Sequence, residues 1–304
     1  MNPKVSVIVP HYRAGDTLGR CLESVTRQSF DSWECLVIDD NPAADYSDHV
    51  RRKFNDARFR WYDNPANLGV STTRNIGNRL ACGDYIVVLD ADDESSVNRL
   101  HETVTIFEKY PNVGLIAGAA QPALAKDQDD RGATTAQTEQ QFPYIREVKQ
   151  VELLLGCPFV HSCVAYRRSL TLTPFYITYN PSLLVAHDYD IYRQLAEANQ
   201  LMALSSSVYS YRHETGFGLM NRLINRMIEE SVMIKCQIAK HLIPDLTYNQ
   251  CTALSYMLTY SRFVTQSHRD ICEQIIGTVL HENELVQPIY QIIKSRFEEM
   301  KAPL

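Results

Sequence analysis

Three carboxylates stand within the four-residue segment Asp90–Asp93, directly after an apolar run. Like charges this close repel one another unless a cation or a helix N-terminus compensates them. Oxygen-only ligands suit Mg²⁺ or Mn²⁺, which keeps waters and shares its coordination sphere with substrate phosphates. We therefore predict a divalent-cation site at these carboxylates. The alternative, that Asp93 or Ser95 caps the next helix, accounts for one acid and not for three.

A second acidic pair, Asp39-Asp40, follows the apolar run Glu34–Ile38. A carboxylate in this position accepts hydrogen bonds from a ribose hydroxyl or from an N–H of a base. The pair therefore predicts a nucleotide contact. The alternative is a plain turn, because Asp-Asn-Pro at residues 40–42 is good turn chemistry.

The segment Asn67–Asn75 leads into a predicted helix and carries Gly69 and Arg74. A helix N-terminus with an arginine in its first turns is suited to binding a phosphate or a diphosphate. The alternative is a glycine turn followed by a surface arginine.

Two further segments offer proton-transfer or ligand groups. Asp188 or His187, at the start of another predicted helix, is able to act as a general base. Alternatively, the acids of that segment cap the helix and complement its dipole. His213 follows Tyr211-Arg212 and is a candidate metal ligand or phosphate contact. Its alternative is a loop histidine, one of nine histidines in the chain.

Strand and helix patterns alternate over the first 120 residues, and this alternation determines where the acids lie. Strands of about five residues alternating with helices of about twelve imply right-handed βαβ units and a mostly parallel sheet. Ligands bind beyond the carboxyl ends of such strands, so Pro10–Tyr12, Asp39-Asp40 and Asp90–Asp93 are expected to meet at one edge. The predicted strands are Lys4–Val9, Glu34–Ile38, Phe59–Tyr62, Tyr85–Leu89 and Val113–Ala117, and the predicted helices are Thr17–Gln28, Tyr46–Phe54, Ser71–Ala81 and Val97–Phe107.

The rest of the chain is less regular. Lys126–Gln141 has no bulky apolar residue and predicts a solvated loop. A helix is expected over Val148–Leu155, a strand over Phe159–Arg167, and helices over Tyr189–Ala198 and from Leu219 onward. We predict an α/β domain of residues 1–218, with halves 1–120 and 121–218, followed by a helical extension of residues 219–304.

The composition of the 304 residues excludes several classes of protein. With 45% hydrophobic and 22% charged residues, the chain is expected to be globular and to hold one α/β domain with an extension, or two domains. The formal net charge of −6 argues against a nucleic-acid partner. The sequence has no Gly-x-Gly-x-x-Gly or P-loop motif, which disfavours a dehydrogenase or a P-loop nucleotidase. No uncharged apolar run reaches about 18 residues and no signal-peptide pattern opens the chain, so a cytoplasmic location is expected.

Taken together, these segments resemble family 2 glycosyltransferases of the GT-A fold. Val5–Tyr12 resembles the family's opening strand, Ser24–Phe30 its "SI..Q.." helix end, and Leu36–Asn41 its "IVIDDGS" strand end. Asn67–Gly77 is similar to "N.G.s.ARN.G", and Ala81–Asp93 to "A.GeYI..lDaDD". The motifs occur in the family's order. The resemblance implies a nucleotide-sugar-binding half over residues 1–120 and an acceptor half over residues 121–218.

The resemblance also implies an activity and site residues. It implies a metal-dependent enzyme that transfers a sugar with inversion from a nucleotide-diphosphate donor, with UDP favoured, to a saccharide or lipid-linked acceptor. The implied product is a surface polysaccharide or a related glycoconjugate. Asp188, which lies where the family often has "ED..l", is the implied base, and Mn²⁺ or Mg²⁺ is the implied cofactor. The implied metal ligands are Asp92, Asp90 and His213, the last from a segment similar to "YR.H". The implied donor-binding residues are Pro10, His11, Tyr12, Asp39, Asp40, Asn67, Gly69, Arg74, Asp90 and Ala91.

The chain departs from the family pattern at three places. Arg13 stands where the family commonly has asparagine, and Asn41-Pro42 replaces the Gly-Ser that follows the acids. His187 replaces the glutamate before Asp188. The donor contacts near Arg13 and Asn41 are therefore the least supported by the resemblance.

Two rival functions stay open. A nucleotidyltransferase also uses a doubly wound sheet with acidic metal ligands, but it usually carries a glycine-rich basic loop after the first strand, which His11–Gly15 matches poorly. The non-catalytic rival is a nucleotide-sugar-binding protein whose C-terminal helices form an interaction module. The helices after residue 218 have three interpretations: they cover the sheet, form a homodimer surface, or dock peripherally on the inner face of the membrane.

Overall fold

The computed structural model describes residues 2–40, 48–123, 144–172, 174–212, 223–259, 264–278, 284 and 287–301. The chain divides into two compact units. The first unit combines Met1–Glu147, Phe159–Ser182 and Gln200–Gly216; the second combines Val148–Pro158, Leu183–Asn199 and Phe217–Leu304. The predicted domain boundary after residue 218 and the predicted loop Lys126–Gln141 lie outside the described residues.

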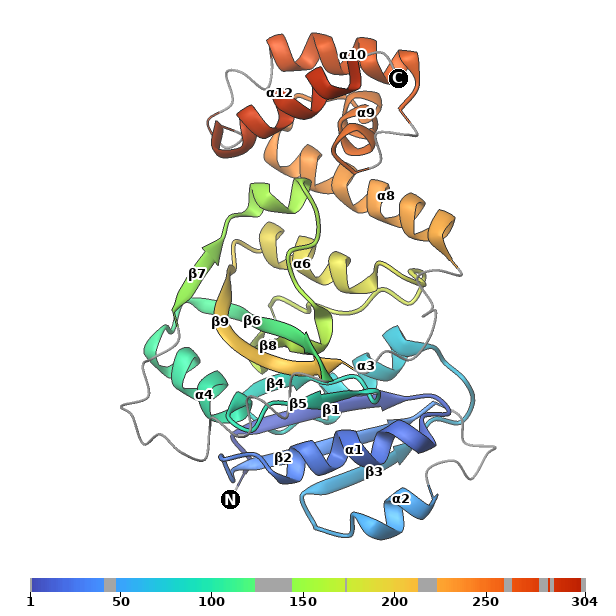
Figure 1. The fold of residues 1–304 in the computed structure, drawn as a ribbon, viewed down its shortest axis with the longest axis vertical. Coiled ribbons are helices and arrows are strands. Elements are labelled where there is room, and N and C mark those ends of the chain that lie inside the picture. Colours follow the sequence, from blue (N-terminus) through green and yellow to red (C-terminus); the bar gives the residue numbers. More distant parts are fainter. Residues whose placement is uncertain are drawn as a thin grey trace. The chain divides into compact units, whose positions relative to one another are not determined.

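Four parallel strands form the first half of the sheet, as the alternating pattern predicts (Figure 1). Their registers pair His11 with Asp39 and Asp39 with Asp63, so three strand ends lie side by side. The strands are β1 (Val5–His11), β2 (Trp33–Asp39), β3 (Phe59–Asp63) and β4 (Tyr85–Val88). The intervening helices are α1 (Gly15–Thr26), α2 (Asp48–Lys53), α3 (Val70–Leu80) and α4 (Arg99–Lys109).

The second half of the sheet is mixed. β4 pairs antiparallel with β8, β8 antiparallel with β6, and β6 parallel with β9. The order along the sheet is β3-β2-β1-β4-β8-β6-β9-β5, with β7 also paired to β9. The elements of this half are β5 (Asp93–Ser95), β6 (Val113–Pro122), β7 (Ile145–Val148), η3 (His161–Cys163), β8 (Val164–Arg167), η4 (Arg168–Thr171) and β9 (Leu201–Arg212). The predicted α/β class with a mixed, mostly parallel sheet is confirmed.

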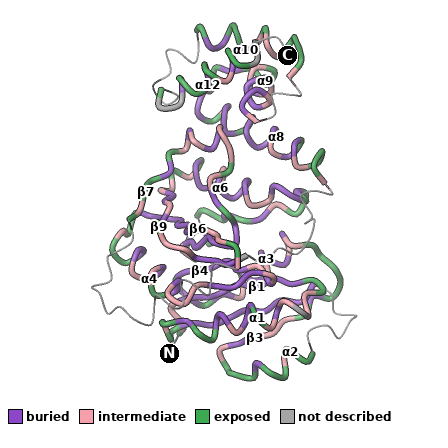
Figure 2. The backbone as a smooth tube through the Cα atoms, viewed as in Figure 1, coloured by how far each residue is buried: buried purple, intermediate pink, exposed green. Residues whose placement is uncertain are grey.

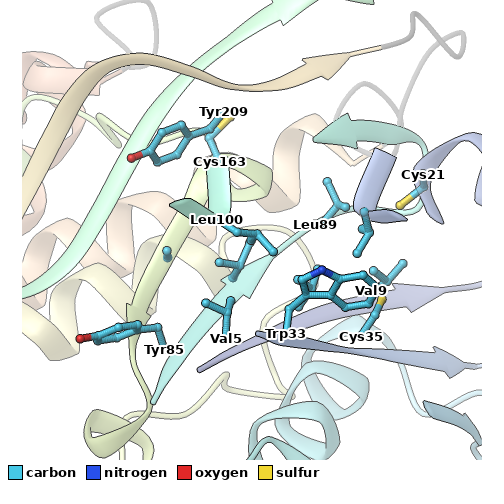
Figure 3. Close-up of a cluster of buried hydrophobic side chains, with 14 of the residues drawn as sticks. Val5, Val9, Cys21, Trp33, Cys35, Tyr85, Leu89, Leu100, Cys163 and Tyr209 are labelled. Atoms are coloured by element: carbon cyan, nitrogen blue, oxygen red, sulfur yellow. The ribbon is translucent and has the colours of Figure 1, made fainter. Parts of the chain in front are cut away.

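The core of the first unit lies between the sheet and its helices (Figure 3). Val5 and Val9 of β1 and Leu89, which directly follows β4, pack in one cluster with Leu100 of α4, and all four are buried. On another face, a Cβ at Gly77 would lie 2.6 Å from the side chain of Ile8. Glycine at this position therefore lets α3 lie directly against β1, which fixes the helix that carries Arg74.

The second unit is helical. Its helices pack in the chain α6–α8–α9–α10–α12, and buried and exposed residues alternate along α8 (Figure 2). Among the described helices, none is both long and apolar enough to cross a membrane. The elements are η2 (Gln150–Leu154), α6 (His187–Glu197), α8 (Ile224–Leu242), α9 (Tyr248–Thr259), α10 (Gln266–Gly277) and α12 (Gln287–Lys301).

Two local predictions were correct only in part, and one strand was not predicted. The predicted strand over Phe159–Arg167 is a 3₁₀ turn followed by a strand that begins only at Val164, and the helix predicted over Val148–Leu155 is the short 3₁₀ helix η2. Strand β5 was not predicted, because its residues Asp93–Ser95 are all polar and show no apolar alternation. Its pairing with β9 is a long-range contact that no local pattern contains.

A buried lysine in the second unit leads to a prediction about pH. Lys235 of α8 is 1% exposed, and its Nζ donates a hydrogen bond to Oγ1 of Thr259 at 2.5 Å. Burial, and to a lesser extent Arg296, lowers the pKa of Lys235 from 10.5 to about 7. Between these two values the unfolded chain holds a proton that the folded chain lacks. The free energy of unfolding should therefore rise with pH in this window, by up to about 1.4 kcal/mol per pH unit.

The variant Lys235→Met tests this prediction. Methionine fills a similar volume without a charge, so the variant should be more stable than the wild type at pH 7, and this advantage should shrink toward about pH 9. Urea denaturation at both pH values measures it, with exposed Lys294→Met as the control. An advantage of the same size at both pH values would contradict the assignment.

Candidate active site

The ends of β1 and β2 bring a buried histidine and a buried carboxylate together. His11 Nε2 lies 3.8 Å from Asp39 Oδ2, and their side chains are 1% and 5% exposed. Burial lowers the pKa of His11 and outweighs the opposing effect of Asp39, so the ring is neutral at pH 7 and the pair is not an ion pair. Neither ring nitrogen of His11 has a hydrogen-bond partner among the described residues. The His11 ring therefore has hydrogen-bonding capacity left for a ligand.

An exposed aromatic ring follows this pair, and Pro10, buried in β1, precedes it. Tyr12 is 47% exposed, and the Arg13 guanidinium lies 5.1 Å from its ring centroid. Arg13 adopts a left-handed backbone conformation, with φ of 55°. This is the position where the family pattern has asparagine, which tolerates that conformation better; arginine there costs about 1 kcal/mol.

The carboxylate of Asp40 is occupied by hydrogen bonds within the protein. It accepts hydrogen bonds from Asn64 Nδ2 at 2.8 Å and from the backbone N–H groups of Leu68 and Gly69 at 2.8 and 2.9 Å. Gly69, with φ of 81°, also donates its N–H to Asn67 Oδ1 at 3.1 Å and precedes α3 as its N-cap. These bonds join the end of β2 to the start of α3. Asp40, Asn67 and Gly69 thus shape the loop.

Arg74 of α3 connects the loop to the acids after β4. It is 5% exposed, and its Nη2 donates to Asp90 Oδ1 at 2.7 Å. Its guanidinium also lies 5.5 Å from the ring centroid of Tyr179. The alternative interpretation of Arg74 as a surface arginine was therefore wrong. Buried arginine is costly unless it serves a structure or a ligand, and here it fixes one of the two predicted metal ligands.

The residues that support Arg74 were not predicted from the sequence. The side-chain amide of Asn75 donates to the carbonyl of Tyr179 at 2.8 Å and accepts from its N–H at 2.9 Å. The Tyr179 hydroxyl lies 2.9 Å from His161 Nε2. Asn75 belongs to the segment that resembles the family motif, so the sequence pointed to one of these supporting residues. Tyr179 and His161 lie more than eighty residues away in sequence and had no signal.

The acids after β4 differ in their surroundings. Asp90 and Asp92 are half-buried, Ala91 is buried, and Asp93 is 2% exposed within β5. The alternative that Asp93 or Ser95 caps α4 was wrong, because Asn98 is the N-cap residue. Among the described residues, no three His, Cys, Asp or Glu side chains form a cluster that could hold a metal. Two carboxylates still suit Mg²⁺ or Mn²⁺, which takes the rest of its ligands from substrate phosphates and water. His213 lies outside the described residues.

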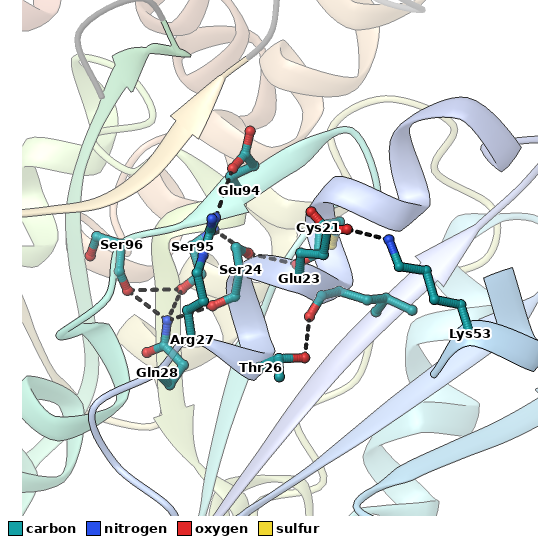
Figure 4. Close-up of polar contacts among 11 residues, drawn as sticks. Cys21, Glu23, Ser24, Thr26, Arg27, Gln28, Lys53, Glu94, Ser95 and Ser96 are labelled. Carbon is teal, nitrogen blue, oxygen red and sulfur yellow. Dashed lines mark hydrogen bonds and ion pairs between the residues drawn. The ribbon is translucent and has the colours of Figure 1, made fainter. Parts of the chain in front are cut away.

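A second set of missed residues holds β5, next to these acids, against α1 (Figure 4). Gln28 Nε2 donates to Ser95 Oγ at 3.3 Å and to the carbonyl of Ser96 at 2.7 Å. The N–H of Ser95 donates to Ser24 Oγ at 2.8 Å. Ser24 and Gln28 are the polar positions of the segment that resembles "SI..Q..". The motif therefore contained both residues, but it did not indicate that they bind β5.

The candidate base lies in the second unit. Asp188 is in the first turn of α6, is half-buried, and accepts the N–H of Tyr189 on Oδ1 at 2.7 Å. The residue at the N-cap is Ala186, so the acids of this segment do not cap the helix with a side chain, although they stand where they complement its dipole. Asp190 has a different role, because its Oδ1 accepts a bond from Arg193 at 2.8 Å.

Comparison with known proteins identifies the class to which this fold and site belong. The family model described as glycosyl transferase family 2 matches residues 6–172, more than half of the chain. The chain belongs to glycosyl transferase family 2.

Curated relatives match the chain over a shorter stretch. The chain is 34% identical over 117 residues to the Escherichia coli UDP-Glc:alpha-D-GlcNAc-diphosphoundecaprenol beta-1,3-glucosyltransferase WfgD, covering 38% of this chain and 44% of that protein. It is 33% identical over 100 residues to the Escherichia coli K12 putative colanic acid biosynthesis glycosyl transferase WcaA, covering 33% of this chain and 36% of that protein. These matches therefore span less than half the length of either relative.

Solved structures extend the likeness of fold over nearly the whole chain. Staphylococcus aureus TarS 1–349 in complex with UDP-GlcNAc superposes with a TM-score of 0.63 at 16% identity, covering 98% of this chain and 89% of that one. The mannosyltransferase PcManGT from Pyrobaculum calidifontis, in complex with GDP-Man and Mn²⁺, gives 0.59 at 15% identity, covering 99% and 86%. The predicted GT-A fold with C-terminal helices is confirmed.

Proposed function

We propose that the protein is an inverting glycosyltransferase that uses a UDP-sugar and a divalent cation to extend a surface polysaccharide or a related glycoconjugate. The observation that carries this proposal is the ion pair between buried Arg74 and half-buried Asp90, next to Asp92 in sequence, at the end of β4. It joins a fixed positive charge to a pair of carboxylates, as a site for a diphosphate and its cation requires. The family membership, the WfgD name and the TarS complex with UDP-GlcNAc support the donor class.

In this proposal the donor lies along the strand ends. His11 and Asp39 face the base and ribose, and the exposed Tyr12 ring lies over the bound base and ribose. Asp92 and Asp90 would hold Mn²⁺ or Mg²⁺, which supplies charge neutralisation to the diphosphate when bound. Arg74 offsets negative charge that develops on the leaving nucleoside diphosphate.

The transfer step needs a base on the acceptor side. Asp188 accepts the proton of an acceptor hydroxyl while the hydroxyl oxygen forms a bond to the anomeric carbon. The bond from that carbon to the diphosphate oxygen breaks on the opposite face, and its electron pair leaves with the nucleoside diphosphate. This single displacement inverts the anomeric centre. A saccharide or lipid-linked acceptor, a cytoplasmic location and peripheral contact with the inner face of the membrane are further parts of the proposal.

An assay of product release tests the proposal against its rivals. The purified protein is incubated with UDP-glucose, UDP-GlcNAc or GDP-mannose, with Mn²⁺ or EDTA. The expected result is slow release of UDP with Mn²⁺, accelerated by a saccharide acceptor. Pyrophosphate release from UTP and a sugar phosphate would instead indicate a nucleotidyltransferase. Binding of UDP-sugars with no release under any condition would indicate a non-catalytic protein.

A further inference from the structure

One carboxylate of the C-terminal helices is bound by three consecutive backbone N–H groups. Glu230 of α8 is 3% exposed. Its Oε1 accepts the N–H of Leu184 at 2.9 Å, and its Oε2 accepts those of Val185 and Ala186 at 3.0 and 2.9 Å. Arg226, one turn earlier on α8, donates its Nε to Oε1 at 2.8 Å. Four donors therefore surround one buried carboxylate.

The three N–H groups belong to the entry of α6. Ala186 is the N-cap residue of α6 and its side chain cannot cap the helix. Glu230 instead binds the N–H of this N-cap residue and of the two residues before it, and its negative charge complements the helix dipole. The backbone from Leu184 to Ala186 is thus fixed by a residue from a different helix.

The surroundings of Glu230 favour the ionised form of its carboxyl group. Burial of the carboxyl group favours its neutral form, but the backbone donors from Ala186, Leu184 and Val185, together with Arg226, outweigh this, and the pKa of Glu230 is lowered. Hydrogen bonds to an ionised acceptor are roughly twice as strong as neutral ones. The helix entry is therefore held by the strongest kind of hydrogen bond available to it.

Asp188 follows Ala186 by two residues, in the first turn of α6. We infer that Glu230 is a positioning residue for the base Asp188, so that α8 is part of the catalytic apparatus. This inference rests on the proposed function, because it takes Asp188 as the base. It gives the C-terminal helices a role within this chain that none of their three interpretations from sequence contains.

Three variants test the inference. Glu230→Ala removes the acceptor, Glu230→Gln keeps an amide oxygen that accepts N–H bonds, and Glu229→Ala is the matched control. Glu229 is the next residue, its side chain is 66% exposed, and it lies 3.8 Å from the same Arg226. Glu230→Ala should lower kcat for transfer roughly 10- to 100-fold through misplacement of the base. Glu230→Gln should recover part of that loss, Glu229→Ala should match the wild type, and the Kd for UDP should not change in any variant.

A double-mutant cycle separates positioning from general damage. If Glu230 acts through Asp188, then Asp188→Asn with Glu230→Gln should be no less active than Asp188→Asn alone. Wild-type kcat in Glu230→Ala, or multiplicative losses in the double variant, would overturn the inference and leave the proposed function intact. Full activity of Asp188→Asn would remove the base assignment and the inference with it. Because Glu230→Gln keeps the side-chain shape, the cycle can be measured even if Glu230→Ala does not fold.

Discussion

Asparagine in place of Asp188 is expected to lower kcat for sugar transfer by roughly 100- to 10,000-fold, the range typical for loss of a general base. The side chain keeps its size and can still accept the N–H of Tyr189, but the amide cannot take a proton from the acceptor hydroxyl. Donor affinity should be unchanged, because the base acts on the acceptor. Transfer kinetics with saturating donor, together with calorimetric titration of UDP, measure the two quantities separately.

Asp190→Asn is the matched control for this variant. Asp190 lies in the same helix turn, is 4% exposed, and is bonded to Arg193. Its replacement should lower thermal stability, because half-buried Arg193 loses a buried charged partner, and should leave kcat close to that of the wild type. Equal losses of kcat in both variants would show that the helix, and not the carboxylate of Asp188, is what transfer requires.

The first unit could be predicted largely from local pattern. Apolar runs of strand length determine β1, β2 and β4, and in a parallel sheet their carboxyl ends meet, so Asp39 and Asp90 were expected at one edge. The pairing of His11 with Asp39 in the register of β1 and β2 agrees with that expectation. The order of strands beyond β4 was not predictable, because it is determined by contacts between segments far apart in sequence.

Sequence did not reveal which polar groups are already used by the protein. Asp40 was expected to contact a nucleotide, yet its carboxylate is bound by Asn64, Leu68 and Gly69. The bonds of Glu230 to the entry of α6 span 44 to 46 residues. Such contacts form only when separate elements pack against each other, so no periodicity or motif in the sequence indicates them. What the structure reveals beyond the sequence is therefore mainly the residues that hold the candidate site in place, and not further residues that would react.

Asparagine in place of Asp92 is expected to remove the Mn²⁺-dependent part of donor binding. Asp92 is half-buried in the segment after β4, and in the proposed function it is a ligand of the cation. An amide is a weaker ligand for a hard cation than a carboxylate. Since charge stabilisation by a bound metal is worth several kcal/mol, transfer should fall by roughly 1,000-fold. UDP titrations with Mn²⁺ and with EDTA measure the binding, and product release measures the transfer.

Asp93→Asn separates this effect from a general loss of negative charge. Asp93 is the next residue but is buried in β5, so its replacement should change stability and leave the response to Mn²⁺ as in the wild type. In the wild type, EDTA should weaken UDP binding; in Asp92→Asn it should have little further effect. Equal UDP affinity with Mn²⁺ and EDTA in the wild type would contradict the cation site. Arg74 would then be the main compensating charge that the described residues offer a diphosphate at the end of β4.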